Sequence, residues 1–156
     1  MTKFWQDVVL PIREKLIAIL KAQASANNVE VGEIIAGIHG SPLRYQRTGI
    51  YVLVPSSPDP KLLTTVSGQA TLRFPIDCNL AAWTEAQHLD QLGEMEGVVV
   101  DALAANPTLA GLLGVSEAWV SLLGPIEVEF GGGPVPHVAT QTHIVSVLVE
   151  WNVNQV

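Results

Sequence analysis

Four histidines and one cysteine are the side chains best suited to metal, acid–base or nucleophilic chemistry at neutral pH. No two of His39, His88, His137 and His143 have the i, i+4 spacing that places two metal ligands on one helix face. His39 lies two residues before Ser41, but the Gly-x-Ser-x-Gly pattern of a nucleophile elbow is absent from the sequence. These residues therefore predict neither a zinc site nor a hydrolase site, and a turn is the expected role of His39–Ser41.

Cys78 and the glycine-rich segment also lack the patterns of known catalytic or cofactor sites. Cys78 shares the apolar side of a predicted strand, which favours a buried structural thiol over a nucleophile. Gly131-Gly132-Gly133 lacks the spacing of a dinucleotide-binding loop, and no phosphate-binding loop with its lysine occurs. We therefore expect no cofactor, no metal and no enzymatic activity.

Carboxylates are the remaining groups with chemical potential. Asp90, Glu94, Glu96 and Asp101 could supply a pair for acid–base work, but a solvated or channel-facing helix surface explains them more simply. All eight Lys and Arg residues fall within residues 1–73, which carry a net charge of +3, whereas residues 74–156 carry −10. This asymmetry permits head-to-tail contact between copies, although the charges could merely solvate two faces. The acidic total argues against sequence-specific DNA binding.

Composition places the chain among globular domains with an unusually apolar surface. Charged residues make up 15% of the sequence, against about 25% in average proteins, and partners can cover such a surface. The length fits a single domain spanning residues 1–156. No stretch of about 20 apolar residues predicts a membrane span, and Gln6 and Asp7 interrupt any signal-peptide core. One cysteine forms no internal disulfide, which fits synthesis in a reducing cytosol.

Two helices are predicted from apolar residues spaced three and four apart. The first runs from Phe4 to Asn27-Asn28, and Pro11 either kinks it or occupies the first turn of its main part. The second follows a capping box at Thr84–Gln87 and ends at Asn106-Pro107. Its expected apolar stripe consists of Leu89, Leu92, Met95, Val99 and Leu103.

Five strands are predicted, at Glu33–His39, Ile50–Val54, Gln69–Cys78, Ile126–Phe130 and Thr142–Trp151. Pro75 cannot donate to a sheet ladder, so the third strand is expected at an edge or with a bulge. The last two strands predict a long C-terminal β-hairpin whose tip, Gly131–Pro136, should be mobile until it docks. The element order predicts an α+β fold: a mainly antiparallel sheet of four to five strands with two main helices packed on one face.

This order of elements resembles the tail-terminator proteins of long-tailed bacteriophages and the related neck and tail-completion proteins. An N-terminal amphipathic helix precedes a pair of strands, and the chain ends on the alternating strand Thr142–Trp151. The second helix leads directly into Asn106-Pro107-Thr108-Leu109-Ala110-Gly111, which is similar to an Asn-Pro-x-Leu-x-Gly turn of that group. The sequence departs from the basic late patch often found there, because no Lys or Arg follows Arg73.

The resemblance implies a structural protein of the virion tail or neck, assembled in the host cytoplasm. It implies a homo-oligomeric ring, most simply a hexamer, that terminates the tail tube and contacts the tube and head–tail connector proteins. DNA would pass through the lumen without specific binding, and no membrane is involved. Another neck adaptor or tail-tube ring subunit is an alternative, and so is a small oligomeric ligand-binding domain or an unrecognised enzyme.

Charge and glycine content then predict which residues meet DNA or a neighbour. Subunit or partner contacts are expected at Arg44, Arg47, Arg73, Gly131, Gly132 and Gly133. Because a channel should repel phosphates, acids are expected to face the lumen. The candidates are Asp90, Glu94, Glu96, Asp101, Glu127, Glu129 and Glu150.

Overall fold

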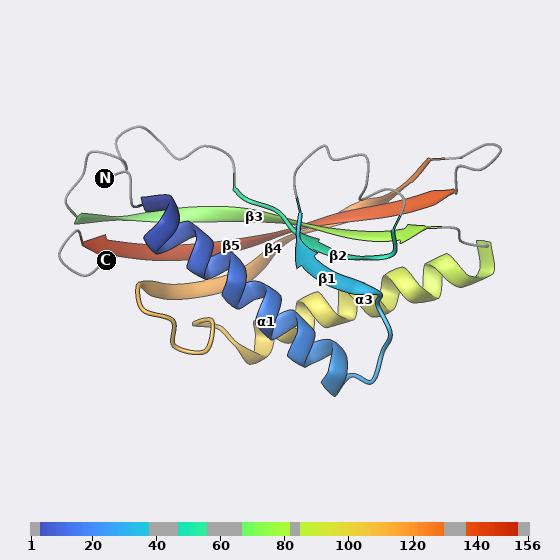
Figure 1. Ribbon diagram of the computed structural model, residues 1–156, viewed down its shortest axis with the longest axis horizontal. Coiled ribbons are helices and arrows are strands. Elements are labelled where there is room, and N and C mark those ends of the chain that lie inside the picture. The colour runs from blue at the N-terminus through green and yellow to red at the C-terminus, as the bar shows by residue number, and fades with distance from the viewer. Residues whose placement is uncertain (1–3, 38–46, 56–66, 82–84, 130–136, 153–156) are drawn as a thin grey trace.

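The computed structural model describes residues 4–37, 47–55, 67–81, 85–129 and 137–152; the side chains of residues 67, 85–89 and 151–152 lie outside the description. Figure 1 shows a long twisted sheet with two helices beside it. The elements are a π-helical turn η1 (Trp5–Val9), α1 (Leu10–Ala26), β1 (Glu33–Ala36), β2 (Gly49–Val52), β3 (Ser67–Ala81), α3 (Glu85–Ala105), β4 (Val115–Glu129) and β5 (Val138–Asn152).

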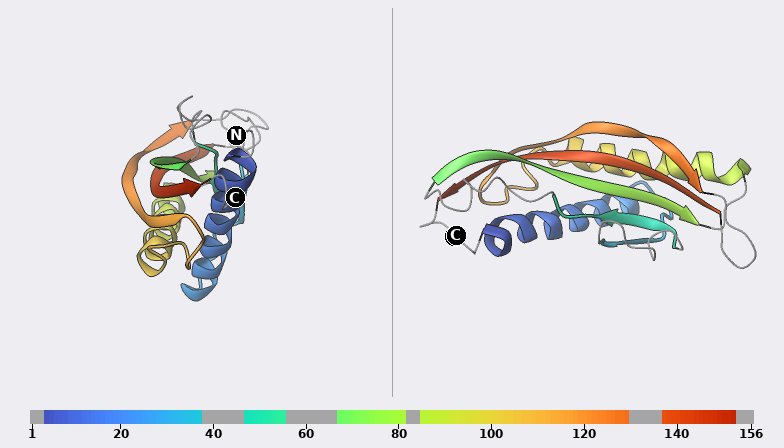
Figure 2. Two further views of the ribbon diagram at one scale, coloured as in Figure 1. Left: turned by 90° about the vertical axis from the view of Figure 1, so that its left-hand side faces the viewer. Right: turned by 90° about the horizontal axis from the view of Figure 1, so that it is seen from above.

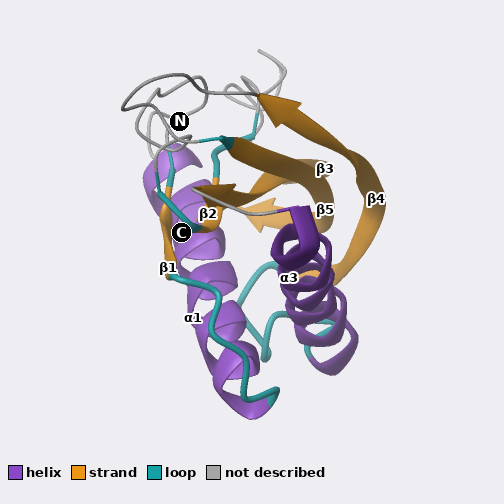
Figure 3. Ribbon diagram, turned by 90° about the vertical axis from the view of Figure 1, so that its right-hand side faces the viewer, coloured by secondary structure: helices purple, strands orange, loops and turns teal. Residues whose placement is uncertain are grey.

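The sheet has five strands in the order β1-β2-β3-β5-β4. β2, β3, β5 and β4 pair antiparallel, whereas β1 pairs parallel with β2, so the sheet is mixed. Both helices lie against one face of the sheet (Figure 3). The predicted α+β class, the five strands and the mainly antiparallel pairing are thus confirmed, while the parallel pair is an addition that the sequence pattern did not reveal.

The first helix forms as its apolar spacing predicts. Ile12, Leu16 and Leu20 are buried on its inner face. Pro11 lies in the first turn of α1, directly after the π-helical turn η1. Asn28 adopts a left-handed φ of 55°, and the Val29 amide donates back to the Ala24 carbonyl, so the helix ends in a Schellman motif.

The second helix buries the predicted stripe where its side chains are described. Leu92, Met95, Val99 and Leu103 are fully or almost fully buried, and Leu89 and the capping box at Thr84 lie outside the description. The Asn106 side-chain amide donates to the Ala102 carbonyl at 2.8 Å. This bond supplies a partner to one of the carbonyls that every helix leaves free at its C-terminus.

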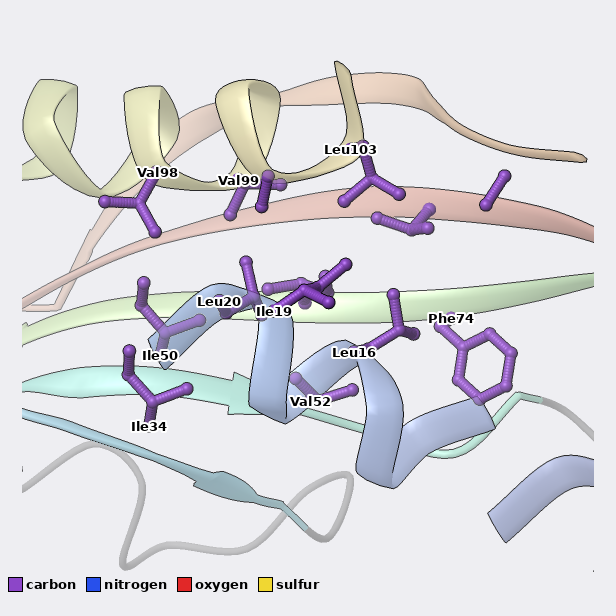
Figure 4. Packing of buried hydrophobic residues seen from close by; sticks show 14 of the residues in the cluster. Leu16, Ile19, Leu20, Ile34, Ile50, Val52, Phe74, Val98, Val99 and Leu103 are labelled. Atoms are coloured by element: carbon purple, nitrogen blue, oxygen red, sulfur yellow. The ribbon is translucent and has the colours of Figure 1, made fainter. Parts of the chain in front are cut away.

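The core lies between the helices and one face of the sheet (Figure 4). Alternate residues of β3, from Leu72 to Leu80, point into it, as the period-two pattern of Gln69–Cys78 predicted. Their partners on β5 include Val145 and Val147, which are fully buried. We call this side of the sheet the helix face, and the opposite side, which carries Arg73 and Asp77 of β3, the helix-free face.

Pro75 does not mark a sheet edge, because β3 lies between β2 and β5 and is the central strand. The expectation of an edge position was wrong for a local reason. Pairing with β2 ends at Ile76, and beyond it only the Leu53 amide donates to the Pro75 carbonyl, at 3.0 Å. The N–H that proline lacks would have pointed to the same side, where β2 has already ended, so the pairing with β5 continues unbroken.

β4 and β5 pair antiparallel along most of their length, and Ile126 and Val145 fall in the strands predicted for them. β4 is longer than predicted because it already begins at Val115. Three irregularities interrupt its register. The predicted tip Gly131–Pro136 lies outside the described residues. Within the described chain, neither helix has the length and apolar character to cross a membrane.

Gly32 and Gly97 provide a matched test of this backbone. Gly32 has φ +77°, and a Cβ there would collide with the Thr48 carbonyl oxygen, whereas a Cβ at Gly97 on α3 meets open space. We expect Gly32→Ala to lower the free energy of unfolding by about 1–3 kcal/mol and Gly97→Ala to raise it by about 0.5–1 kcal/mol. Urea unfolding measures both, and a Gly32→Ala variant as stable as the wild type would contradict this geometry.

Candidate functional site

Two of the groups suited to catalysis, Cys78 and His143, are buried within the described structure. The Cys78 side chain has no exposed surface, and burial, with help from the nearby Asp77 and Glu96 carboxylates, raises the pKa of its thiol far above the ordinary value. Burial therefore disfavours the thiolate form, and the predicted buried position of Cys78 is confirmed. His39 and the side chain of His88 lie outside the description, and His137 is exposed.

His143 of β5 lies in the core, opposite the register irregularity of β4 at Leu123/Ile126. Its Nδ1 accepts a hydrogen bond from the Gly124 amide at 3.3 Å. Burial lowers the pKa of His143 below 6.5, although the Glu96 and Asp77 carboxylates oppose the shift. Because Nδ1 is the acceptor, the proton of the neutral ring resides on Nε2, for which no described group provides a hydrogen bond.

Gln141 links this irregularity to α3. Its side-chain amide donates to the Gly124 carbonyl at 2.9 Å and to Glu96 Oε2 at 3.1 Å. A Cβ at Gly124 would collide with the Thr142 carbonyl oxygen, so the close approach of β4 to β5 requires glycine there. Gln141, His143 and Gly124 therefore fix the bulge by hydrogen bonds.

A second polar cluster joins β1 to β2. The Tyr51 hydroxyl donates to Glu33 Oε1 at 2.8 Å, and burial together with this bond raises the pKa of Tyr51 well above its ordinary value. Arg47 Nη1 lies 3.9 Å from Glu33 Oε1, and 67% of the Arg47 side chain is exposed. Most of the Arg47 side chain is thus available to a partner.

The predicted lumen acids lie on both sides of the sheet. Asp90, Glu94 and Asp101 are exposed on α3, and Glu96 is half-buried beside them. The other three are exposed on the helix-free face, because they share the register positions of Thr140, Val138 and Gln69. These are Glu127, Glu129 and Glu150. A single flat surface cannot contain all seven acids, so at most one of the two groups faces any one channel.

The predicted contact residues are also separated. Arg73 is exposed on β3 in the centre of the helix-free face, while Arg47 lies near the β1 edge. Arg44 and Gly131, Gly132 and Gly133 lie outside the described residues.

An exposed apolar surface on β4 is the feature that sequence reasoning missed. Five large apolar side chains of this edge strand are between 37% and 54% exposed: Trp119, Leu122, Leu123, Ile126 and Val128. We call them the β4 edge patch. The strand curves around the outside of α3 (Figure 2), so Leu123, Ile126 and Val128 are exposed although they belong to the helix face. Trp119 and Leu122 are exposed on the helix-free face, so the edge strand exposes apolar side chains on both of its faces, as interaction sites do.

The available signal for this patch was the apolar run before Gly124-Pro125, which only Ser121 interrupts. Apolar and polar residues do not alternate in Ala118-Trp119-Val120 or in Leu122-Leu123, so the sequence does not predict a strand with one solvent-exposed face there. Two of the register irregularities fall at Val120/Leu122 and Leu123/Ile126, which breaks the period of two.

No group of three or more metal-ligating side chains occurs among the described residues. No protein-family model matches the chain, and no curated protein matches it significantly.

The low pKa of His143 predicts a pH dependence of stability. Above pH 6.5 His143 is neutral in both the folded and the unfolded state. Below pH 6.5 His143 binds a proton in the unfolded chain, whereas the buried imidazole of the folded protein stays neutral. The free energy of unfolding therefore falls as pH decreases. The slope from this residue is at most about 1.4 kcal/mol per pH unit.

The test compares urea unfolding at pH 7.5 and pH 5.5 in the wild type and in His143→Gln. We expect a smaller loss of stability in His143→Gln, and an unchanged loss in the control His137→Gln, because His137 is exposed. An equal loss in the wild type and His143→Gln would show that this imidazole does not resist protonation.

Proposed function

We propose that this protein is the structural subunit of a homo-oligomeric ring that terminates the tail tube of a long-tailed bacteriophage and contacts the head–tail connector. The β4 edge patch carries the proposal. The patch exposes large apolar side chains on an edge strand. The whole sequence, in addition, has an unusually low content of charged residues. The tail and neck position is inferred from the element order and from the Asn106–Gly111 turn, which resemble the tail-terminator group.

The magnitude of apolar burial supports assembly. Burial of a large apolar side chain that was fully exposed contributes about 1.5–3 kcal/mol, and the patch side chains are 37–54% exposed. Five such residues supply several kcal/mol when a neighbour covers them, which offsets part of the entropy lost on association. In an isolated monomer these side chains stay exposed to water and this stabilisation is absent.

A β4–β5 hairpin reaching the tail tube belongs to the same proposal. The two strands pair antiparallel up to Glu129 and Val138, where the predicted glycine-rich tip would follow. The tip, with Gly131, Gly132 and Gly133, would dock on the tube or a neighbouring subunit. The long antiparallel pairing of β4 with β5 would hold such a tip on a stiff two-stranded arm.

The lumen is most simply assigned to the helix-free face. Glu127, Glu129 and Glu150 are exposed there and outnumber the exposed Arg73, so their net negative charge would repel DNA phosphates during passage. On this arrangement the α3 acids Asp90, Glu94 and Asp101 face the outside of the ring. A neck adaptor or tail-tube subunit would use the same surfaces, and the position in the particle distinguishes it from a terminator.

The proposal predicts rings in electron micrographs of the purified protein or of intact tails. Leu122→Glu places a charge in the centre of the β4 edge patch, so we expect it to abolish the rings and leave a folded monomer. Val100→Glu, at an exposed apolar position on α3 outside the patch, is the matched control and should assemble normally. Sedimentation velocity gives the oligomeric state and thermal unfolding confirms the fold.

Two results would overturn this assignment. One is a wild-type protein that stays monomeric at high concentration and forms no ring in the particle. The other is a Leu122→Glu variant that assembles as well as Val100→Glu.

A further inference from the structure

The two edges of the sheet are both candidates for pairing with another strand. β1 and β4 each have one neighbour in the sheet, on opposite sides. At the start of β4, the Ala118 amide donates to the Pro107 carbonyl at 2.7 Å, so the turn after α3 covers this part of the edge. Beyond Ala118, the sheet provides no described strand on the outer side of β4. Backbone groups on such an edge are a template for a further strand.

Charge argues against pairing β4 with a second β4. Neither α3 nor β4 contains a Lys or Arg, and β4 contains three acids, Glu117, Glu127 and Glu129. A two-fold contact would bring two such acidic strands together without a counter-charge. The β1 edge, in contrast, carries the largely exposed Arg47 side chain beside Glu33. A head-to-tail contact of β4 with the β1 edge therefore removes the repulsion and supplies a cation.

Exposed apolar side chains on the two edges match in position. Ile35 of β1 is 40% exposed and lies on the helix-free face, because it pairs with Tyr51, which pairs with Asp77. Leu122 of β4 lies on the same face, because it pairs with Ile144 beside Pro75. If the sheet continued from one copy to the next, Ile35 would thus meet Leu122 on one surface.

Strand directions fix the orientation of that contact. β1 runs parallel to β2 and therefore to β5, while β4 runs opposite to β5. Rotation about an axis along the strands preserves these directions, so β4 of one copy would meet β1 of the next in an antiparallel pair. With Ile35 opposite Leu122, β1 begins on the side toward Glu127, which lies on the helix-free face. Glu33 and the neighbouring Arg47 side chain lie at that beginning of β1.

We propose that β4 of one copy pairs antiparallel with β1 of the next, so that the sheet continues from subunit to subunit around the ring. The inference rests on the proposed function, because it assigns the contact that closes that ring. The short β1, Glu33–Ala36, suits this role. Irregularities at Val120/Leu122 and Leu123/Ile126, together with Pro125, leave only short regular runs on β4 and hinder longer, non-specific strand addition.

Cysteine cross-linking tests the contact directly. The double variant Ile35→Cys/Leu122→Cys places one thiol on each edge, and native Cys78 is fully buried and does not compete. After oxidation at a concentration where rings form, we expect a ladder of covalent oligomers on a non-reducing gel that collapses on reduction. The single variants Ile35→Cys and Leu122→Cys should stay almost entirely monomeric on that gel, because a head-to-tail contact never brings identical positions together.

Three outcomes overturn the inference. Efficient dimers of Leu122→Cys alone would show a two-fold β4–β4 contact. Rings in micrographs without any cross-linked ladder would show that the ring closes elsewhere, and the proposed function would survive. A monomer with neither rings nor ladder would refute both the contact and the proposed function.

A charge exchange provides an independent measurement if the cysteine variants fold poorly. Arg47→Glu and Glu127→Arg should each weaken assembly by a few-fold at low salt, and the double variant Arg47→Glu/Glu127→Arg should restore most of the loss. The effects should fade near 1 M salt, where the screening length is about 3 Å. Additive losses in the double variant would contradict the predicted pairing of these two residues.

Discussion

The antiparallel pairing of β3 with β5 is the interaction on which the rest of the structure depends. Both strands are fifteen residues long and stay in register from Ser67↔Asn152 to Ala81↔Val138. An unbroken ladder of this length fixes which residues face the helices. It buries Phe74, Ile76 and Val145 in the core and places Arg73 on the helix-free face. β2 and β4 then add on either side, and their positions follow from this central pair.

The same ladder explains why β4 is exposed. β4 extends the sheet beyond β5, farther than α3 can cover, so its apolar side chains point partly into solvent on both faces. Gln141 and His143 fix the bulge at Gly124 from the core side, and Gln141 connects it to Glu96 of α3. The edge is therefore held in one shape before any partner arrives, which lowers the entropic cost of association. A preformed apolar edge is what a subunit of an assembly requires.

Sequence patterns predicted those features that depend on local periodicity. The alternation in Gln69–Cys78 and the apolar stripe of α3 determine buried faces wherever the elements lie. Pro75 was misplaced because an edge position depends on where a neighbouring strand ends, and the short β2 ends beside it. The β4 edge patch was not predicted because the bulges in β4 interrupt the alternation of apolar and polar residues. The acids of α3 and β4 could not be assigned to one surface, since their relative orientation is set by the tertiary packing.

Hydrogen exchange of the β4 amides tests the central claim that β4 is the assembly edge. Amides between Val120 and Glu129 that point away from β5 should exchange rapidly in dilute monomer and become protected at concentrations where rings form, because backbone pairing shields them. Amides of β3 between Ile76 and Asn79, where β2 and β5 pair with β3 from both sides, should show no such change and serve as the internal control. Rings that form while the exchange of these β4 amides stays as fast as in the monomer would contradict the account.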